Sequence, residues 1–249
     1  MEPRSLQFIA DACGGRILRG AGDLTWRGVS TDSRTIEAGN LFWALAGERF
    51  DGHHFLTAAV RRGAAAVVVE RGDAVPADLA VAAVQVDASR AALGRLAAAH
   101  REGMKATVVA VAGSNGKTTT KEILAAVLRR RFRVHASPAS YNNDVGVPLT
   151  LLGIEAGHEA AIVEVGTNHP GELAPLLRMV RPLVGILTGV GREHLEFLGS
   201  LEGVAEEEGW LAELLPAEGR LVLPGDTPFA DRILRRSPAP AIRVGTRAE

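Results

Sequence analysis

The sequence predicts an α/β protein, in which a small N-terminal α/β domain precedes a P-loop domain built on a mostly parallel sheet with helices on both faces. In the second half of the chain, short apolar runs alternate regularly with longer helix-forming runs. These apolar runs are nearly continuous, as is typical of parallel strands that are covered on both faces. A glycine turn that contains Gly113 and Lys117 joins the first of them to a helix-forming run, which is the arrangement of a phosphate-binding loop.

Composition narrows the class of protein. The 249 residues suffice for one large or two medium domains. The 28 basic and 29 acidic residues balance, which argues against a general nucleic-acid or membrane-surface binder. The one cysteine, Cys13, excludes an internal disulfide and argues against a metal site of several thiolates. The chain lacks a signal-peptide pattern and any apolar run near the ~18 residues of a membrane span, so we expect a soluble cytoplasmic protein without a membrane span.

The first domain is expected to cover residues 1–103. Ser5 is a candidate N-cap for a helix over residues 6–12, which Gly14 would end. Apolar runs then predict strands, and alanine-rich runs predict helices. The expected strands cover residues 41–45, 64–70 and 82–86, the expected helices cover residues 57–62 and 89–101, and a candidate linker covers residues 101–103.

The second domain is expected to cover residues 104–249. The expected strands cover residues 107–112, 160–165, 184–189, 220–223 and 242–244, and the expected helices cover residues 117–131, 172–180 and 201–215. Ligands of parallel sheets gather at the carboxyl ends of the strands, which singles out residues 113–118, 164–169 and 188–194. No closing element follows the last expected strand, which predicts that a part of the fold is missing.

The glycine turn over residues 113–119 is the strongest functional feature. Its N–H groups can face phosphate oxygens, helped by the positive end of the following helix. Lys117 would add a charge on the β- and γ-phosphates, and the Thr118 hydroxyl would bind Mg²⁺, so we expect ATP and Mg²⁺ here. The common P-loop has glycine where Val111 stands. The alternative, an ordinary turn with a surface lysine, explains poorly why one of three lysines lies in a glycine turn. The expected cofactor-binding residues are Gly113, Ser114, Asn115, Gly116, Lys117, Thr118 and Thr119.

Two further residues lie at expected carboxyl ends of strands. Glu164 ends a buried strand, where an unpaired carboxylate is costly, so it either binds Mg²⁺ or forms a buried salt bridge. A loop histidine such as His194 is by itself more often not a ligand. Its convergence with Glu164 and Thr118 at one edge of the sheet favours a metal site formed by these three residues.

The expected helix after Ser200 carries an apolar stripe. The stripe consists of Leu201, Val204, Leu211 and Leu215. Glu208 falls on the same face, whereas Glu206 is expected to be solvated and Glu207 is ambiguous. Glu208 is therefore either a ligand of a second metal ion or a helix-end carboxylate that reaches solvent or an arginine. Asn142 and Asn143 either build a turn or bind polar groups of a ligand, and their spacing does not decide between these roles.

These motifs resemble the Mur ligase family over nearly the whole chain. In the first domain the motifs cover residues 30–34, 39–45 and 47–53, with Phe55. In the second domain they cover residues 113–119, 142–148, 164–172 and 194–196. The Gly-x-x-Gly-Lys-Thr spacing is the form that this family uses. The Asp-Ser-Arg segment is shared with the MurE branch, and the strings that begin at Asn142 and Glu164 are more similar to the MurF branch, which adds D-Ala-D-Ala.

The resemblance implies an ATP-dependent amide ligase of peptidoglycan precursor synthesis. The terminal carboxylate of UDP-MurNAc-tripeptide attacks the γ-phosphate, and the amine of D-Ala-D-Ala then displaces phosphate from the acyl phosphate. It also implies that Lys117 and Thr118 hold the phosphates and Mg²⁺, that Glu164 binds Mg²⁺, and that His194 helps to hold a second Mg²⁺. The residues it places at the UDP-linked substrate are Ser30, Asp32, Ser33, Arg34, Asp51, Gly52, His53, Asn142 and Asn143.

The chain departs from the family in two respects. Many members carry a carbamoylated lysine after the His-Leu-Glu segment, but no lysine follows Lys121 here. Glu208 stands about where that lysine would be, and we expect its carboxylate to replace the carbamate in catalysis. Members also carry a third, Rossmann-like domain, so we expect a missing C-terminal domain or a complementary chain. A MurE-type ligase, and a module that binds UDP-MurNAc-peptide and nucleotide without turnover, remain alternatives; the Asp-Ser-Arg domain argues against a folylpolyglutamate synthase-like enzyme.

Overall fold

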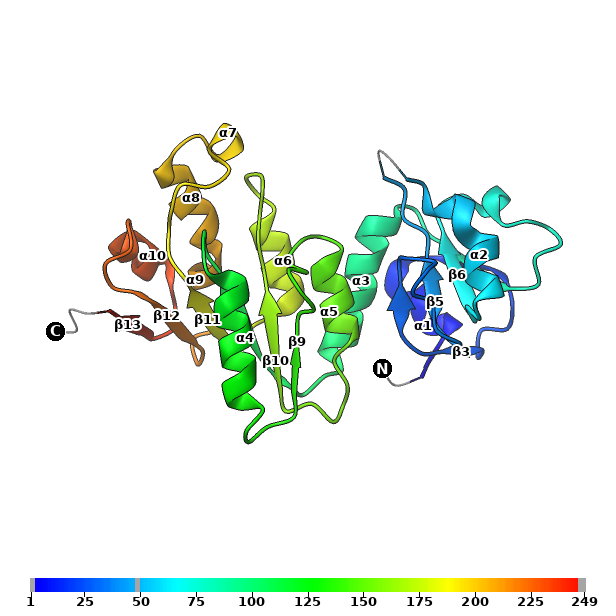
Figure 1. Ribbon diagram of the computed structural model, residues 1–249, viewed down its shortest axis with the longest axis horizontal. Helices are drawn as coiled ribbons and strands as arrows, with labels where there is room; N and C mark the ends of the chain where they lie inside the picture. The colour runs from blue at the N-terminus through cyan, green and yellow to red at the C-terminus, as the bar shows by residue number, and fades with distance from the viewer. Residues whose placement is uncertain (1–2, 48–49, 246–249) are drawn as a thin grey trace. The chain divides into compact units, whose positions relative to one another are not determined.

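The computed structural model describes residues 3–47 and 50–245. The chain divides into two compact units, residues 1–103 and 104–249, which we describe separately (Figure 1). No helix of the described ranges is long and apolar enough to cross a membrane.

The first unit holds a five-stranded sheet in the order β2-β7-β6-β5-β4, parallel except where β2 meets β7, and a small antiparallel pair, β1 and β3. Its strands are β1 Arg4–Ser5, β2 Arg16–Arg19, β3 Thr25–Trp26, β4 Val29–Ser30, β5 Leu41–Trp43, β6 Ala66–Val69 and β7 Ala82–Gln85. Its helices are α1 Leu6–Cys13, α2 Leu56–Arg61 and α3 Ser89–Glu102, with 3₁₀ turns η1 Gly52–Phe55 and η2 Gly72–Ala74. The short strands β1 to β4 were not predicted.

The predicted ends of α1 are confirmed. The Ser5 side chain accepts a hydrogen bond from the Phe8 N–H group at 3.2 Å, as an N-cap does. Gly14 follows the helix with φ 61°, a left-handed conformation that glycine adopts without a steric penalty. Local side-chain chemistry therefore sets both ends of this helix.

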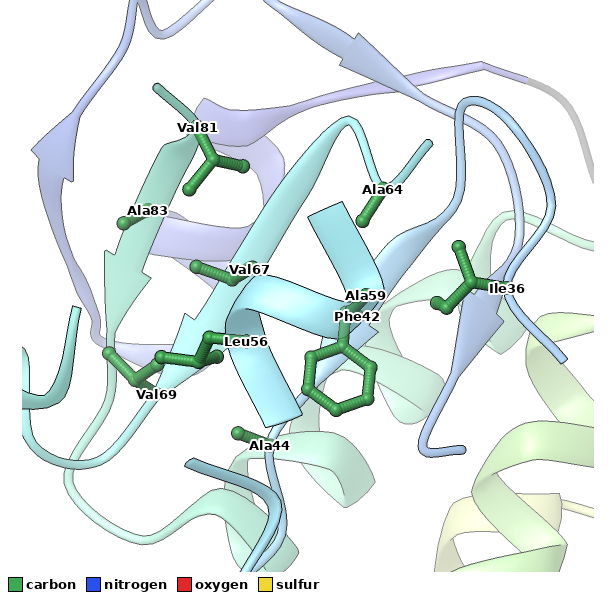
Figure 2. Packing of buried hydrophobic residues seen from close by; sticks show 10 residues of the cluster. All are labelled: Ile36, Phe42, Ala44, Leu56, Ala59, Ala64, Val67, Val69, Val81 and Ala83. Carbon is green, nitrogen blue, oxygen red and sulfur yellow. The ribbon is translucent and has the colours of Figure 1, made fainter. Parts of the chain in front are cut away.

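One core cluster of the first unit lies between α2 and one face of the sheet. Figure 2 shows Phe42 of β5, Leu56 and Ala59 of α2, and Val67 and Val69 of β6 gathered in one buried cluster. Strand residues two apart point to the same face, which is why Val67 and Val69 meet the same helix. The strands β4, β5 and β6 are parallel to one another, so their carboxyl ends lie along one edge of the sheet.

The second unit holds a six-stranded, fully parallel sheet in the order β13-β12-β11-β8-β10-β9, which confirms the predicted fold class. Its strands are β8 Thr107–Ala112, β9 Val134–Ala136, β10 Ala160–Glu164, β11 Val184–Leu187, β12 Arg220–Pro224 and β13 Ala241–Val244. Its helices are α4 Lys117–Leu128, α5 Gly146–Leu152, α6 Leu173–Val180, α7 Leu195–Leu198, α8 Leu201–Glu208, α9 Trp210–Glu213 and α10 Ala230–Arg236. The elements β9, α5, α7 and α10 were not predicted.

Helices cover both faces of this sheet. Ile186 of β11 packs in the cluster that Ala125 of α4 forms with Val111. The neighbouring residue, Gly185, faces the other side, where an added Cβ would lie 3.0 Å from Leu211 of α9. Because successive strand residues point to opposite faces, α4 and α9 lie on opposite sides. The expected arrangement of the second domain is thereby confirmed.

The helix expected over residues 201–215 is interrupted at Gly209, between α8 and α9. An added Cβ at Gly209 would collide with the Arg236 guanidinium. That guanidinium donates a hydrogen bond to the Glu206 carbonyl oxygen at 2.7 Å, so it occupies the space a side chain would need. The apolar periodicity alone did not reveal this break.

Candidate functional site

The glycine turn between β8 and α4 is shaped by close packing against the segment after β11. Gly113 has φ 116°, and an added Cβ would lie 2.5 Å from the Thr188 Oγ1 atom and 2.9 Å from the Gly189 carbonyl oxygen. Gly116 has φ 83° and immediately precedes α4. Gly113 therefore leaves no room for a side chain, and the positive φ of Gly116 favours glycine. Together they direct the chain from the strand into the helix.

Ser114 forms hydrogen bonds to the same segment, and its contact with a nucleotide stays a prediction. Its N–H group donates to the Gly189 carbonyl oxygen at 3.0 Å, and its hydroxyl accepts from the Gly191 N–H group at 2.8 Å. Ser114 therefore holds the turn in place rather than offering its N–H group to an anion. The N–H groups of Asn115 and Gly116 make no hydrogen bond within the described ranges, so they remain open at the start of α4.

Lys117 lies over its own turn. Its Nζ atom donates to the Gly113 carbonyl oxygen at 2.5 Å and lies 3.8 Å from the Glu193 Oε2 atom. The other Glu193 oxygen, Oε1, is buried without a hydrogen bond in the described part of the chain. Sequence reasoning missed Glu193, although it directly precedes His194 at the predicted carboxyl edge.

Glu208 faces the interior, as the apolar stripe predicted. The residue is 1% exposed, and neither carboxylate oxygen has a hydrogen-bond partner among the described residues, which excludes the solvent-reaching or arginine-paired alternative. Burial raises the pKa of Glu208 to about 8, against the opposing effect of the Lys117 charge. Glu193 raises this pKa further, and the Gly113 N–H group lowers it, which places the carboxyl beside the glycine turn.

The two preceding glutamates have structural partners. Glu206 is exposed and forms an ion pair with Arg232, as expected for a solvated position. Glu207 is buried and accepts hydrogen bonds from the Gly171 and Leu173 N–H groups at 2.9 and 2.8 Å. These N–H groups lie at the beginning of α6, so Glu207 joins α8 to α6 and resolves the ambiguity in the sequence.

Glu164 is buried at the end of β10 and is only partly satisfied. Its Oε1 atom accepts a hydrogen bond from the Asn142 Nδ2 atom at 2.9 Å. Its Oε2 atom has no hydrogen bond in the described part of the chain and lies 3.9 Å from the Lys121 Nζ atom. The structure therefore brings Asn142 to Glu164. Asn143 instead builds a turn, because its Oδ1 atom accepts from the Val145 and Gly146 N–H groups before α5.

His194 is exposed and precedes α7 in a left-handed conformation, with φ 46°. No three His, Cys, Asp or Glu side chains of the described ranges come together as a metal-binding group. A preformed centre that joins His194 to the acidic residues is therefore not present in those ranges. His194 is exposed, whereas the side chain of the neighbouring Glu193 lies beside Lys117.

The donor set fits a nucleotide with a divalent cation. Buried carboxylate oxygens without partners are costly, and a divalent cation such as Mg²⁺ binds carboxylate oxygens well. Such oxygens belong to Glu164, Glu193 and Glu208. The open N–H groups at the start of α4 and the Lys117 ammonium supply the complementary positive side for phosphates.

In the first unit, the segment after β4 forms a self-bonded turn. The Ser30 hydroxyl accepts from the Asp32 N–H group at 3.2 Å. Asp32 accepts hydrogen bonds from the Arg34 side chain at 2.7 Å and from its N–H group at 2.9 Å, and these bonds lower the pKa of Asp32 to about 2. The Arg34 side chain is 86% exposed and Ser33 is half-buried, so the turn presents a fixed carboxylate and a free guanidinium face.

Hydrogen bonds of Asp51 and His53 tie the segment over residues 51–53 into the fold. The buried His53 ring donates from Nδ1 to Asp51 at 2.6 Å, and its Nε2 atom accepts from the Glu70 N–H group at 3.0 Å. Both ring nitrogens are therefore occupied. Asp51 also pairs with Arg71, and an added Cβ at Gly52 would lie 2.7 Å from the Leu45 nitrogen. Residues 48–49 of the predicted motif lie outside the described residues.

Comparison with known proteins identifies the relatives of the chain. The Mur ligase middle domain matches residues 111–249, and the Mur ligase family catalytic domain matches residues 25–105. The UDP-N-acetylmuramoyl-tripeptide–D-alanyl-D-alanine ligase of Bacillus subtilis is 38% identical over 230 residues, which are 92% of this chain and 50% of that protein. The Escherichia coli ligase of the same name is 39% identical over 222 residues, 89% of this chain and 48% of its own length.

Solved structures agree with these matches. A MurF crystal structure from Acinetobacter baumannii has a TM-score of 0.89 at 32% identity and covers 99% of this chain and 54% of its own. MurF from Thermotoga maritima in complex with ADP has a TM-score of 0.78 at 32% identity and covers 89% of this chain and 51% of its own. The chain thus spans about half the length of the curated relatives it matches.

Proposed function

Because the chain belongs to the Mur ligase family, we propose that it is the UDP-substrate- and nucleotide-binding part of an ATP-dependent ligase that joins D-Ala-D-Ala to UDP-MurNAc-tripeptide. The names of the curated relatives support this substrate pair. The observation that carries the proposal is the glycine turn, with its lysine and open N–H groups, beside buried carboxylate oxygens that lack partners. Such a ligase acts in cytoplasmic peptidoglycan precursor synthesis.

The second unit would bind ATP with Mg²⁺. The N–H groups from Asn115 to Lys117 face the phosphates, and the Lys117 ammonium adds a positive charge. Thr118 and Glu164 would hold Mg²⁺, and Thr119 follows Thr118 in the first turn of α4. Bound Mg²⁺ neutralises phosphate charge that develops during transfer. The complex of Thermotoga maritima MurF with ADP supports nucleotide binding by this fold.

Glu208 would hold a second Mg²⁺ together with His194, in place of the carbamoylated lysine of other members. Its two oxygens are buried without a hydrogen-bond partner among the described residues, and the Gly113 N–H group and the Lys117 charge act on it from the glycine turn. Glu193 adds a third unsatisfied carboxylate oxygen to the same surroundings. A cation at this position would compensate the burial of these charges.

The first unit would bind the UDP-linked substrate. Ser30, Asp32, Ser33 and Arg34 form the exposed turn after β4, where a carboxylate and a guanidinium are held at fixed positions. Asp51, Gly52 and His53 would contribute to substrate binding by fixing the backbone of their own segment. Asn142, which donates a hydrogen bond to Glu164, would also bind the substrate. Asn143 would support it by holding the turn that follows Asn142.

The reaction needs positioning and charge neutralisation more than covalent catalysis. The tripeptide carboxylate attacks the γ-phosphorus, ADP leaves, and an acyl phosphate forms. The amine of D-Ala-D-Ala then attacks the acyl carbon, phosphate leaves, and the nitrogen loses a proton. Lys117 stabilises the charge on the transferred phosphoryl group in the first step.

Substrate-dependent phosphate release tests the proposal. In the whole ligase of which this chain forms part, we expect release from ATP only when UDP-MurNAc-tripeptide and D-Ala-D-Ala are both present. A Lys117→Met variant abolishes this release, while a Lys105→Met variant at an exposed position does not. Release with meso-diaminopimelate and the dipeptide substrate instead would identify a MurE-type ligase. Selective binding of UDP-MurNAc-tripeptide without release would identify a binding module.

A further inference from the structure

Lys121 is a fully buried lysine on α4, with 0% of its side chain exposed. Burial of an ammonium group is costly unless the group is paired and hydrogen-bonded. The Nζ atom donates to the Ser137 carbonyl oxygen at 2.8 Å and to the Ala139 carbonyl oxygen, and it lies 2.9 Å from the Glu122 Oε1 atom. An ammonium has three N–H donors, so these partners account for all of them.

The carbonyls that Lys121 binds belong to a segment, residues 137–142, that holds Glu164 from two sides. The Ser137 hydroxyl accepts a hydrogen bond from the Glu164 N–H group at 2.9 Å. At the other end of the segment, the Asn142 side chain donates to the Glu164 Oε1 atom at 2.9 Å. Between them, Ala139 has φ 42°, a conformation that is unfavourable for alanine and needs support from its surroundings. Lys121 provides that support.

Lys121 lies near the Glu164 carboxylate but does not form a hydrogen bond with it. The distance from the Lys121 Nζ atom to the Glu164 Oε2 atom is 3.9 Å, which is too long for a hydrogen bond. The Lys121 donors point to other partners, and Glu122 offsets the ammonium charge. The Glu164 Oε2 atom consequently has no hydrogen bond within the described ranges, although the carboxylate is fixed by Asn142 and by its own backbone.

We propose that Lys121 is a positioning residue, which ties the helix of the glycine turn to the segment over residues 137–142 and so keeps the Glu164 Oε2 atom free and oriented for a divalent cation. This inference rests on the proposed function, in which Glu164 takes part in holding the cation that accompanies the nucleotide. Lys121 does not contact the phosphates in this account. Its loss therefore weakens the cation-dependent part of nucleotide binding and leaves the cation-independent part intact.

Binding measurements on the full chain test this role without any turnover. Mn²⁺ serves as the spectroscopic probe, and its affinity is measured by electron paramagnetic resonance in the presence of ADP. ADP affinity is measured by calorimetry with Mn²⁺ and with a chelator. We expect Lys121→Met to weaken Mn²⁺ binding by ~10-fold or more, the size of effect that groups orienting metal ligands have, and to leave metal-free ADP binding within about threefold. Lys105→Met, at an exposed position, is the control.

Lys121→Gln guards against a folding defect, because it removes the charge and keeps N–H donors for the Ser137 and Ala139 carbonyls. Each variant is compared with the wild type by circular dichroism and thermal unfolding. Unchanged Mn²⁺ affinity in a folded Lys121→Met variant overturns the inference, and so does an equal loss of ADP affinity with and without Mn²⁺ in either variant. If the wild type itself binds no ADP with Mn²⁺, the proposed function fails, and this inference fails with it.

Discussion

Replacement of Glu208 by glutamine is expected to make the protein more stable at neutral pH. Burial raises the pKa of Glu208 from 4.5 to about 8, so the folded protein keeps the proton that the unfolded chain releases above pH 4.5. Stability from this group is therefore fully present below pH 4.5 and is lost as the pH rises towards 8. At ~1.4 kcal/mol per pKa unit, the loss is about 3 kcal/mol at pH 7 and about 4 kcal/mol at pH 8.

Urea denaturation of the wild type and of Glu208→Gln between pH 5 and pH 8 measures this effect. The difference in free energy of unfolding between variant and wild type should grow with pH, at a slope approaching ~1.4 kcal/mol per pH unit. Glu206→Gln is the matched control, because Glu206 is exposed and paired with Arg232, and its curve should run parallel to the wild type. A Glu208→Gln curve that also runs parallel to the wild type would show that burial does not raise the pKa of Glu208 in the folded protein.

Three further predictions concern particular residues. Gly113→Ala should lower the free energy of unfolding by ~2–4 kcal/mol, since its Cβ would lie 2.5 Å from the Thr188 Oγ1 atom, and a wild-type unfolding midpoint would contradict this packing. Asp51→Asn should cost about 2 kcal/mol through weaker bonds to the buried His53 ring, whereas unchanged urea denaturation would show that this network is not needed. Cys13, whose pKa burial raises to about 12, should react with a thiol reagent ~100-fold more slowly in the native protein than in urea, and equal rates would rule out its burial.

Long periodic segments could be predicted from the sequence because their side chains carry the signal. The apolar run of β8 and the glycine turn before α4 determined the start of the parallel sheet, and Ser5 and Gly14 determined the ends of α1. Strands of two residues, such as β3 and β4, are too short to show alternation. The break at Gly209 depends on a side chain 27 positions later, Arg236, which no local pattern records.

The candidate site was predictable where a residue lies at the end of a strand. Glu164 and the glycine turn follow directly from that rule, and the inward side of Glu208 follows from helical spacing. The partners of these residues come from distant segments, and local patterns could not supply them. Only tertiary packing shows that Glu193 lies beside Lys117 and that Lys121 is buried near Glu164. It also shows that both His53 ring nitrogens are bonded within the fold.

The most direct test of the proposed function is a calorimetric titration of the full chain with UDP-MurNAc-tripeptide, with UDP-GlcNAc as the control ligand. The proposed role of the first unit predicts saturable binding of the tripeptide nucleotide and much weaker binding of the control. Equal affinity for the two ligands, or no binding of either, would contradict the assignment of this chain to the recognition of the UDP-linked tripeptide.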